Sequence, residues 1–161
     1  MSIRVALMVA AIAAASPALA GPSSLVGAWK LVETRQVMAD GRVRSDPDLG
    51  ARPTGYMIYD PSGRMCTVFN DGDAPRWAAE KPTDAEVRAS FNGLVSYCAT
   101  YEVDAARKVL VTHIDVAQTP NHVGVTRERR FELNGDTLIL YPRPLPAGAT
   151  EWSVRLRRVR R

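Results

Sequence analysis

The stretch LVGAWKLVE, residues 25–33, stands at the head of the first β-strand that the sequence predicts. Gly27 precedes Trp29 by two residues, and the predicted strand runs over residues 29–38. It ends before Asp40-Gly41, a dipeptide typical of tight hairpin turns. So short a motif has meaning only where the other strands and turns agree with it.

Turn residues recur at short intervals along the chain, and the runs between them are rich in Val, Ile, Thr, Tyr and Trp. This pattern is typical of many short antiparallel strands. Further strands are predicted over 42–45, 55–59, 64–70, 100–103, 109–116, 123–133, 137–141 and 152–159. About eight or nine meandering strands in one small domain can bury one face and remove their open edges by closing into a barrel. The predicted fold class is therefore all-β, an up-and-down antiparallel barrel.

One segment breaks the strand pattern. In PTDAEVRASFNGLVSY, residues 82–97, Thr83 precedes Glu86 by three residues, which is the spacing of a capping box. One apolar helical face follows, made of Val87, Phe91, Leu94 and Val95. We predict a single helix over about 84–97, and we expect it to cover the opening of the barrel together with the polar loop at 70–82.

The N-terminus has the parts of a secretory signal peptide. A start that carries Arg4 precedes an apolar run at 5–15, and the A-x-A cleavage signal ALA follows at 18–20. We expect residues 1–20 to be removed after Ala20, leaving 21–161 as a single domain in the periplasm or outside the cell. The run is shorter than the roughly 20 residues that span a bilayer, so we expect no stable membrane span. The alternative is an uncleaved anchor helix.

The positive charge of the chain is modest, with a formal net charge of +4. It gathers in RLRRVRR at 155–161, which is either a tail for anionic surfaces or nucleic acid, or the solvated face of a last strand. We favour the solvated strand, because an exported protein seldom meets nucleic acid. We expect no nucleic-acid partner, and a monomer or weak dimer.

Two cysteines, Cys66 and Cys98, are present in the chain. An even count in an exported protein suggests a disulfide, which would stabilise the fold by roughly 3–4 kcal/mol on the chain-entropy model. The alternative is two separate buried thiols, because the sequence does not show whether the two Cα atoms lie within bonding reach.

Pieces of the chain resemble, in the same order, the bacterial lipocalin-like domain family. The matching stretches, over about residues 25–141, are LVGAWKLV, DGRV, GYMIYDPSGRM, TDAEVRASFNGLVSY, TYEVD, VTHID, PNHVG and RRFELNGDTLIL. The resemblance implies a calycin-type barrel in which Gly27 and Trp29 begin the first strand and Trp29 closes one end. It also implies a basic side chain of the last strand over that indole, for which Arg158 is the candidate. Any pocket would then open at the end away from Trp29.

A polar set on three predicted strands is the candidate ligand site. Glu102, His113 and Arg129 each alternate with core residues, and Phe131 indicates that the Arg129 face points inward. If the three faces converge, a buried cluster forms in which Glu102 partners Arg129. This cluster is a structural network, an anchor for the polar head of an apolar ligand, or an acid–base site with His113 as the catalytic candidate. The aromatic residues assigned to the ligand site are Tyr59, Phe69 and Tyr101.

The sequence lacks G-x-S-x-G, H-E-x-x-H, C-x-x-C, Walker A and G-x-G-x-x-G motifs. A metal site formed by His113, Asp115 and His122 is one alternative, although we expect no metal and no cofactor. The leading hypothesis is an exported protein that binds a small, mainly hydrophobic molecule in its barrel. One alternative is a small isomerase-, cyclase- or hydrolase-like barrel enzyme that uses His113 with Glu102 and Arg129. Another is a structural or partner-binding envelope protein without a ligand.

Overall fold

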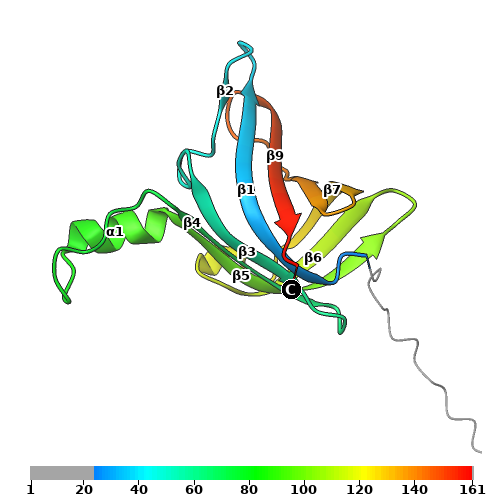
Figure 1. Cartoon of the computed structure of the whole chain (residues 1–161), viewed down its shortest axis with the longest axis horizontal. Helices are drawn as coiled ribbons and strands as arrows, with labels where there is room; N and C mark the ends of the chain where they lie inside the picture. The colour runs from blue at the N-terminus through cyan, green and yellow to red at the C-terminus, as the bar shows by residue number, and fades with distance from the viewer. Residues whose placement is uncertain (1–23, 161) are drawn as a thin grey trace, which may run out of the picture.

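The strands form one antiparallel sheet whose two edges meet (Figure 1). The strand order is β2-β1-β3-β4-β5-β6-β7-β8-β9, and β1 also pairs with β9, which closes the barrel. The strands are β1 (Gly27–Met38), β2 (Val43–Arg44), β3 (Pro53–Tyr59), β4 (Arg64–Asp71), β5 (Leu94–Asp104), β6 (Val109–Ala117), β7 (Thr126–Asn134), β8 (Thr137–Tyr141) and β9 (Ala149–Arg158). The prediction of an up-and-down antiparallel barrel is confirmed, with β2 as an extra strand on β1.

The computed structural model describes residues 24–160. The predicted signal peptide at 1–20 and its cleavage site lie outside the described residues. Within the described range, no helix is long and apolar enough to cross a membrane.

Residues along each barrel strand alternate between the interior and the outer surface. On β4, Met65, Thr67 and Phe69 are buried, whereas Cys66 and Val68 between them are exposed. This is the period of two that a β-strand imposes on its side chains. The inward side chains of the barrel strands form one hydrophobic core that includes Trp29.

Trp29 and Arg158 close one end of the barrel. The Trp29 side chain is fully buried, and the Arg158 guanidinium lies 4.1 Å from the centroid of its ring. Arg158 also donates hydrogen bonds to the carbonyl oxygen of Val26, at 2.9 Å, and to that of Ser24. The arginine therefore holds the chain just before β1 against the indole, which is the arrangement implied by the resemblance to lipocalin-type barrels.

The backbone conformation and close packing of Gly27 explain why a glycine precedes this tryptophan. Its φ is 125°, a region that residues with a side chain rarely adopt, and an added Cβ would lie 3.3 Å from Nη1 of Arg158. The indole Nε1 of Trp29 donates to the carbonyl oxygen of Leu25 at 2.8 Å. The G-x-W pattern thus combines a buried ring, a satisfied ring nitrogen and a glycine that leaves room for the arginine.

The arginines near the C-terminus find acidic partners on neighbouring strands and turns. Arg155 pairs with Glu33 at 2.9 Å, and Arg160 pairs with Asp136. Such exposed ion pairs typically contribute less than about 1 kcal/mol each. The C-terminal stretch is a barrel strand through Arg158, with its outward arginines solvated or paired.

The helix is shorter than predicted. α1 (Asp84–Asn92) begins at the predicted capping box, in which Thr83 N donates to Glu86 at 2.8 Å and Glu86 N donates to Thr83 Oγ1 at 3.3 Å. It ends before Gly93, and the last predicted helical residues, 94–97, instead begin β5. The spacing of Leu94 and Val95 suits a helix or a strand, and hydrogen-bonded pairing with β4 decides for the strand.

The expected cover of the barrel opening is wrong as well. Figure 1 shows α1 projecting away from the barrel wall, and its Val87 and Phe91 side chains are 48% and 50% exposed. Neither α1 nor the loop at 70–82 lines the cavity described below. Leu94 and Val95, which the prediction placed on the apolar face of the helix, pair with β4 instead. The helix therefore keeps only Val87 and Phe91 of that face.

Cys66 and Cys98 form a disulfide between β4 and β5. The two residues lie directly opposite each other in the ladder, with a Cα–Cα distance of 4.1 Å. Both occupy outward-facing positions of their strands. The disulfide interpretation is therefore confirmed, and the bridge braces the wall without reaching the interior.

Candidate functional site

A cavity of about 220 Å³ opens at the end of the barrel opposite Trp29. Trp29 pairs with Arg158 at one end of the β1–β9 ladder, whereas the lining residues Thr34 and Trp152 lie further along the same two strands. The rim comes from connecting segments, namely Asp46, Asp48, Leu49, His122, Pro142 and Arg143. The pocket thus has a wall of strands and a rim of loops.

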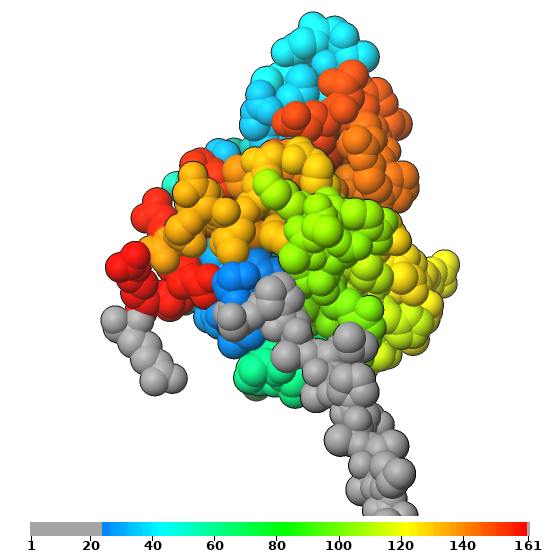
Figure 2. All heavy atoms as spheres, turned by 90° about the vertical axis from the view of Figure 1, so that its right-hand side faces the viewer, coloured from blue at the N-terminus to red at the C-terminus, as the bar shows by residue number. Residues whose placement is uncertain are grey.

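One side of this wall is extended. Figure 2 shows the β1–β2 hairpin and the connection between β8 and β9 rising together above the rest of the barrel. The strands that carry them are paired up to this height, with Val37 of β1 opposite Glu151 of β9 and, after a register shift, Met38 opposite Ala149. The tall wall gives the opening one high side, near Trp152.

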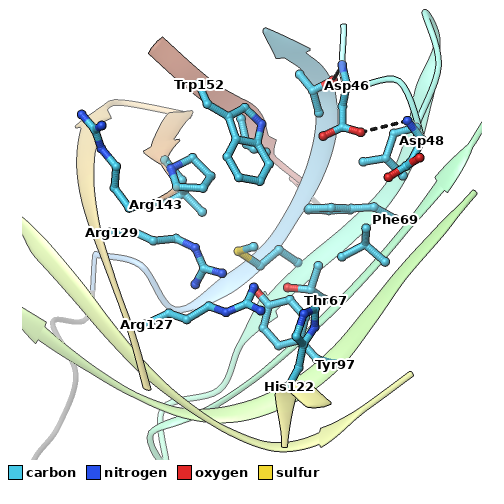
Figure 3. A pocket seen from close by; sticks show the side chains of 17 residues that line it. Asp46, Asp48, Thr67, Phe69, Tyr97, His122, Arg127, Arg129, Arg143 and Trp152 are labelled. Atoms are coloured by element: carbon cyan, nitrogen blue, oxygen red, sulfur yellow. Dashed lines mark hydrogen bonds between the residues drawn. The ribbon is translucent and has the colours of Figure 1, made fainter. Parts of the chain in front are cut away.

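Two arginines of β7 point into the pocket. Arg127 and Arg129 are two residues apart, so both face inward, and Figure 3 shows their guanidinium groups directed toward the middle of the cavity. Arg129 is only 7% exposed. It donates from Nη1 to Thr112 Oγ1 at 3.1 Å, and its guanidinium lies 5.8 Å from the ring centroid of Tyr97.

Neither Arg127 nor Arg129 is neutralised. Within residues 24–160, no carboxylate forms an ion pair with Arg127 or Arg129. Burial lowers the pKa of Arg127, and the neighbouring charge of Arg129 lowers it further. Burial likewise lowers the pKa of His122, with a further contribution from Arg127. This side of the pocket therefore holds an excess of positive charge.

Two further polar groups of the lining have no partner. Thr67 Oγ1 and Trp152 Nε1 are buried, and neither makes a hydrogen bond with any described residue. Buried polar atoms without a partner are rare in folded proteins and typically cost about 1–3 kcal/mol each. Both side chains belong to the lining of the cavity, so two hydrogen-bonding groups without a partner lie close to it.

The acidic groups of the site lie on the rim. Asp46 and Asp48 belong to the connection between β2 and β3, and Asp48 N donates to the Asp46 carboxylate at 3.0 Å. Burial raises the pKa of Asp46. Figure 3 shows both aspartates on the side of the pocket away from Arg127 and Arg129. The β7 side of the pocket is thus cationic, whereas the rim carries the carboxylates of Asp46 and Asp48 together with the guanidinium of Arg143.

The predicted cluster of Glu102, His113 and Arg129 does not form. Arg129 points inward, but Glu102 and His113 are exposed on the outer wall. On β6 the inward positions belong to Thr112 and Ile114, and His113 Nδ1 instead contacts Thr126 Oγ1 at 3.0 Å. The apolar Val109 and Val111 suggested the opposite face, yet they are only partly buried.

The metal alternative gains no support from the geometry. Asp115 pairs with Arg64 on the outer wall, whereas His122 lies at the rim of the pocket. Across residues 24–160, no group of three or more His, Cys, Asp or Glu side chains could hold a metal ion.

The three assigned aromatic residues separate. Phe69 lines the pocket, but Tyr59 and Tyr101 pack edge to face in the core toward the closed end, with ring centroids 4.9 Å apart. The Tyr101 hydroxyl donates to the carbonyl oxygen of Asp60 at 3.0 Å. These two tyrosines fill the barrel and lie outside the set that lines the cavity.

The assignment missed Arg127, Thr67, Trp152 and the rim aspartates. Alternation from Phe131 places Arg127 on the same face as Arg129, so the strand pattern contained the signal for the second arginine. The rim residues lie on connections that have no periodicity, and no sequence pattern locates them.

With this geometry established, comparison with known proteins gives a family. The family model of the lipocalin-like domain matches residues 26–160. The chain belongs to the lipocalin-like domain family. This confirms the resemblance found in the sequence.

Among curated proteins, none matches the sequence of this lipocalin-like domain. Among solved structures, it is similar to a redesigned beta barrel, with a TM-score of 0.44 and 12% sequence identity over 91% of this chain and 100% of that one. Because a fold hosts many functions, the function of this lipocalin-like domain has to be argued from its pocket.

Proposed function

We propose that this lipocalin-like domain is an exported binding protein that holds one small, mainly hydrophobic molecule in the open end of its barrel. The observation that carries the proposal is the 220 Å³ cavity opposite Trp29, with the unpartnered polar atoms of Thr67 and Trp152 in its lining. Ligand pockets combine a largely apolar lining with a few placed polar groups. The apolar lining residues are Leu49, Met57, Phe69, Val95, Leu140 and Val154.

The two ends of the barrel differ in how their interiors are filled. A small barrel without a ligand can fill its interior entirely with side chains. Here Trp29, Tyr59 and Tyr101 fill the closed end, while the open end keeps its cavity. An engineered apolar cavity of about 150 Å³ holds benzene, so 220 Å³ suits a somewhat larger molecule, such as a short alkyl chain with a head group.

The binding proposal has a direct test with a neutral fluorophore. N-phenylnaphthylamine should bind the purified domain saturably with a stoichiometry of one, and native mass spectrometry should show the same bound mass. Val95→Trp narrows the rim and should abolish the fluorescence increase. Val116→Trp places the same bulk on the exposed outer face of β6 and serves as the matched control.

Two results would remove the binding proposal. One is the absence of saturable fluorescence and of bound mass in the wild-type protein. The other is equal binding of the fluorophore to the Val95→Trp and Val116→Trp variants. A ligand inside the barrel should bind more weakly when a bulky side chain replaces the lining residue Val95.

Export has its own test. The sequence signals at 1–20 support cleavage after Ala20. Protein recovered from the periplasm or medium of an expressing bacterium should begin at Gly21 by N-terminal sequencing. Protein that keeps Met1 and stays in the cytoplasm would contradict the proposed location.

A further inference from the structure

The pocket holds positive charge that the described chain leaves uncompensated. Arginines on the outer surface find carboxylates, as Arg130 does with Glu132 and Arg155 with Glu33. Arg127 and Arg129 point the other way and form no such pair. A buried charge without a counter-ion is destabilising, so a fold under no other demand would place an apolar residue or a carboxylate here.

The free hydrogen-bonding capacity of these groups consists largely of donors. A guanidinium carries five N–H donors, and Arg129 uses one nitrogen, Nη1, on Thr112. Trp152 Nε1 is a donor only and is buried without a partner. Thr67 Oγ1 can also donate, and it lies opposite Tyr97 in the β4–β5 ladder. Such a set is complementary to a group with several acceptor oxygens.

The distribution of charge across the pocket fixes how such a group would lie. Figure 3 shows the β7 guanidinium groups on one side and the carboxylates of Asp46 and Asp48 on the other. An anion is therefore attracted toward Arg127 and Arg129 and repelled by the two rim aspartates. Its apolar part would then lie against Phe69 and Leu140.

On the proposed function of the barrel as a binding site, we infer that its ligand is a small amphipathic acid whose carboxylate is held by Arg127 and Arg129. The planar guanidinium fork matches a carboxylate with two parallel hydrogen bonds, which makes arginine better suited to this role than lysine. A carboxylate also supplies the negative charge that neither arginine finds within residues 24–160. The cavity of about 220 Å³ suits an acid with a short alkyl or small aromatic body.

Three probes with one tail and different heads test this inference: octanoate, octanamide and octylammonium. Isothermal titration calorimetry at fixed salt should give the order octanoate, octanamide, octylammonium, with octanoate about 10- to 100-fold tighter than the amide. Arg129→Met should reduce octanoate binding to the level of octanamide and leave octanamide nearly unchanged. Arg127→Met provides a second, independent variant with the same expected direction.

Arg130→Met is the matched control, because it removes a positive charge from the next position of β7 on the outer wall. It should keep the preference for octanoate. Circular dichroism checks that each variant is folded before its affinities are compared.

The outcomes separate this inference from the function on which it rests. Wild-type protein that binds octanamide or octylammonium as tightly as octanoate would overturn the inference and leave the binding function standing. Equal loss of octanoate and octanamide binding in Arg129→Met would also overturn it, because the arginine would then only shape the pocket. If neither octanoate, octanamide nor N-phenylnaphthylamine binds, the proposed function itself fails.

Discussion

The two ends of the barrel use the same residue types in opposite ways. At the closed end, Arg158 lies 4.1 Å from the ring of Trp29, donates to two backbone carbonyls and lies 3.8 Å from the Asp136 carboxylate. At the open end, Arg129 lies 5.8 Å from the ring of Tyr97 and has one hydrogen bond, to a threonine. Both arginines lie beside an aromatic ring. Only Arg158 also has backbone carbonyls that accept from its guanidinium and a carboxylate close to its charge.

This difference shows how a structural arginine can be told from one that is free to bind a ligand. Completed hydrogen bonds and a counter-ion, as at Arg158, indicate a group that stabilises the fold. Missing partners beside a cavity, as at Arg129, Thr67 and Trp152, indicate a group that a ligand could complete. Variants at the two ends of the barrel and in its wall test this difference.

Trp29→Ala should have the largest effect, because it empties the closed end. Truncating a fully buried aromatic side chain typically lowers the free energy of unfolding by about 3–5 kcal/mol. Urea denaturation followed by circular dichroism measures the loss. A loss below about 1 kcal/mol would mean that Trp29 does not hold this end of the barrel.

Removal of the disulfide should lower the stability of the barrel but leave the affinity of the pocket nearly unchanged. Replacing both Cys66 and Cys98 by Ser opens a loop with a sequence separation of 32 and should lower the free energy of unfolding by about 3–4 kcal/mol. Because the bridge lies on the outer face, octanoate affinity of the folded variant should stay within about twofold. A larger loss of affinity would show that the wall and the pocket are coupled.

The same substitution should lower the stability at Arg158 but not at Arg129. Arg158→Met removes hydrogen bonds of a charged donor to backbone carbonyls and should lower the free energy of unfolding by about 1–3 kcal/mol. Arg129→Met removes a buried charge that has no counter-ion and should raise the same quantity by about 1 kcal/mol or leave it unchanged. Equal losses in urea denaturation would remove the distinction between the two ends.

The smallest effect concerns the rim. Burial raises the pKa of Asp46 above 3.8, so the folded protein keeps this proton to a higher pH than the unfolded chain does. The stability due to this group is therefore complete below pH 3.8 and is lost as the pH rises through the raised pKa. Asp46→Asn keeps an oxygen for Asp48 N and should flatten that loss in thermal melts recorded across this range. An unchanged pH profile would show that Asp46 is not buried from water.

Much of the barrel could be predicted from turn chemistry and strand alternation, because these rules act locally. Asp40-Gly41, the capping box at Thr83 and the inward face of Phe131 are all short-range signals. The face of β6 could not be settled this way, since Val109 and Val111 mark one face and Leu110 and Ile114 the other. Pairing with neighbouring strands decides between the two, and it turns His113 outward.

The site itself depends on contacts that no local pattern encodes. Strand alternation identifies Arg129 as inward-facing, whereas the pairing of Glu102 with it requires that the strand faces converge and that a buried charge has a partner. The structure gives Arg129 no such partner among the described residues, and the missing carboxylate is what points to a ligand. The position of the rim residues at 46–49 could not be predicted from the sequence either, because a loop takes its position from the strands that it joins.

The indole N–H signals of the three tryptophans report on both ends of the barrel and on the outer surface in one spectrum. Trp29 Nε1 donates to Leu25 O and Trp77 Nε1 to Ser90 Oγ, whereas Trp152 Nε1 has no partner among the described residues and its side chain lines the pocket. Titration of ¹⁵N-labelled domain with octanoate should shift the Trp152 indole signal saturably and leave those of Trp29 and Trp77 in place. A Trp152 signal that does not move, or a shift confined to Trp29 or Trp77, would contradict a ligand site at the open end.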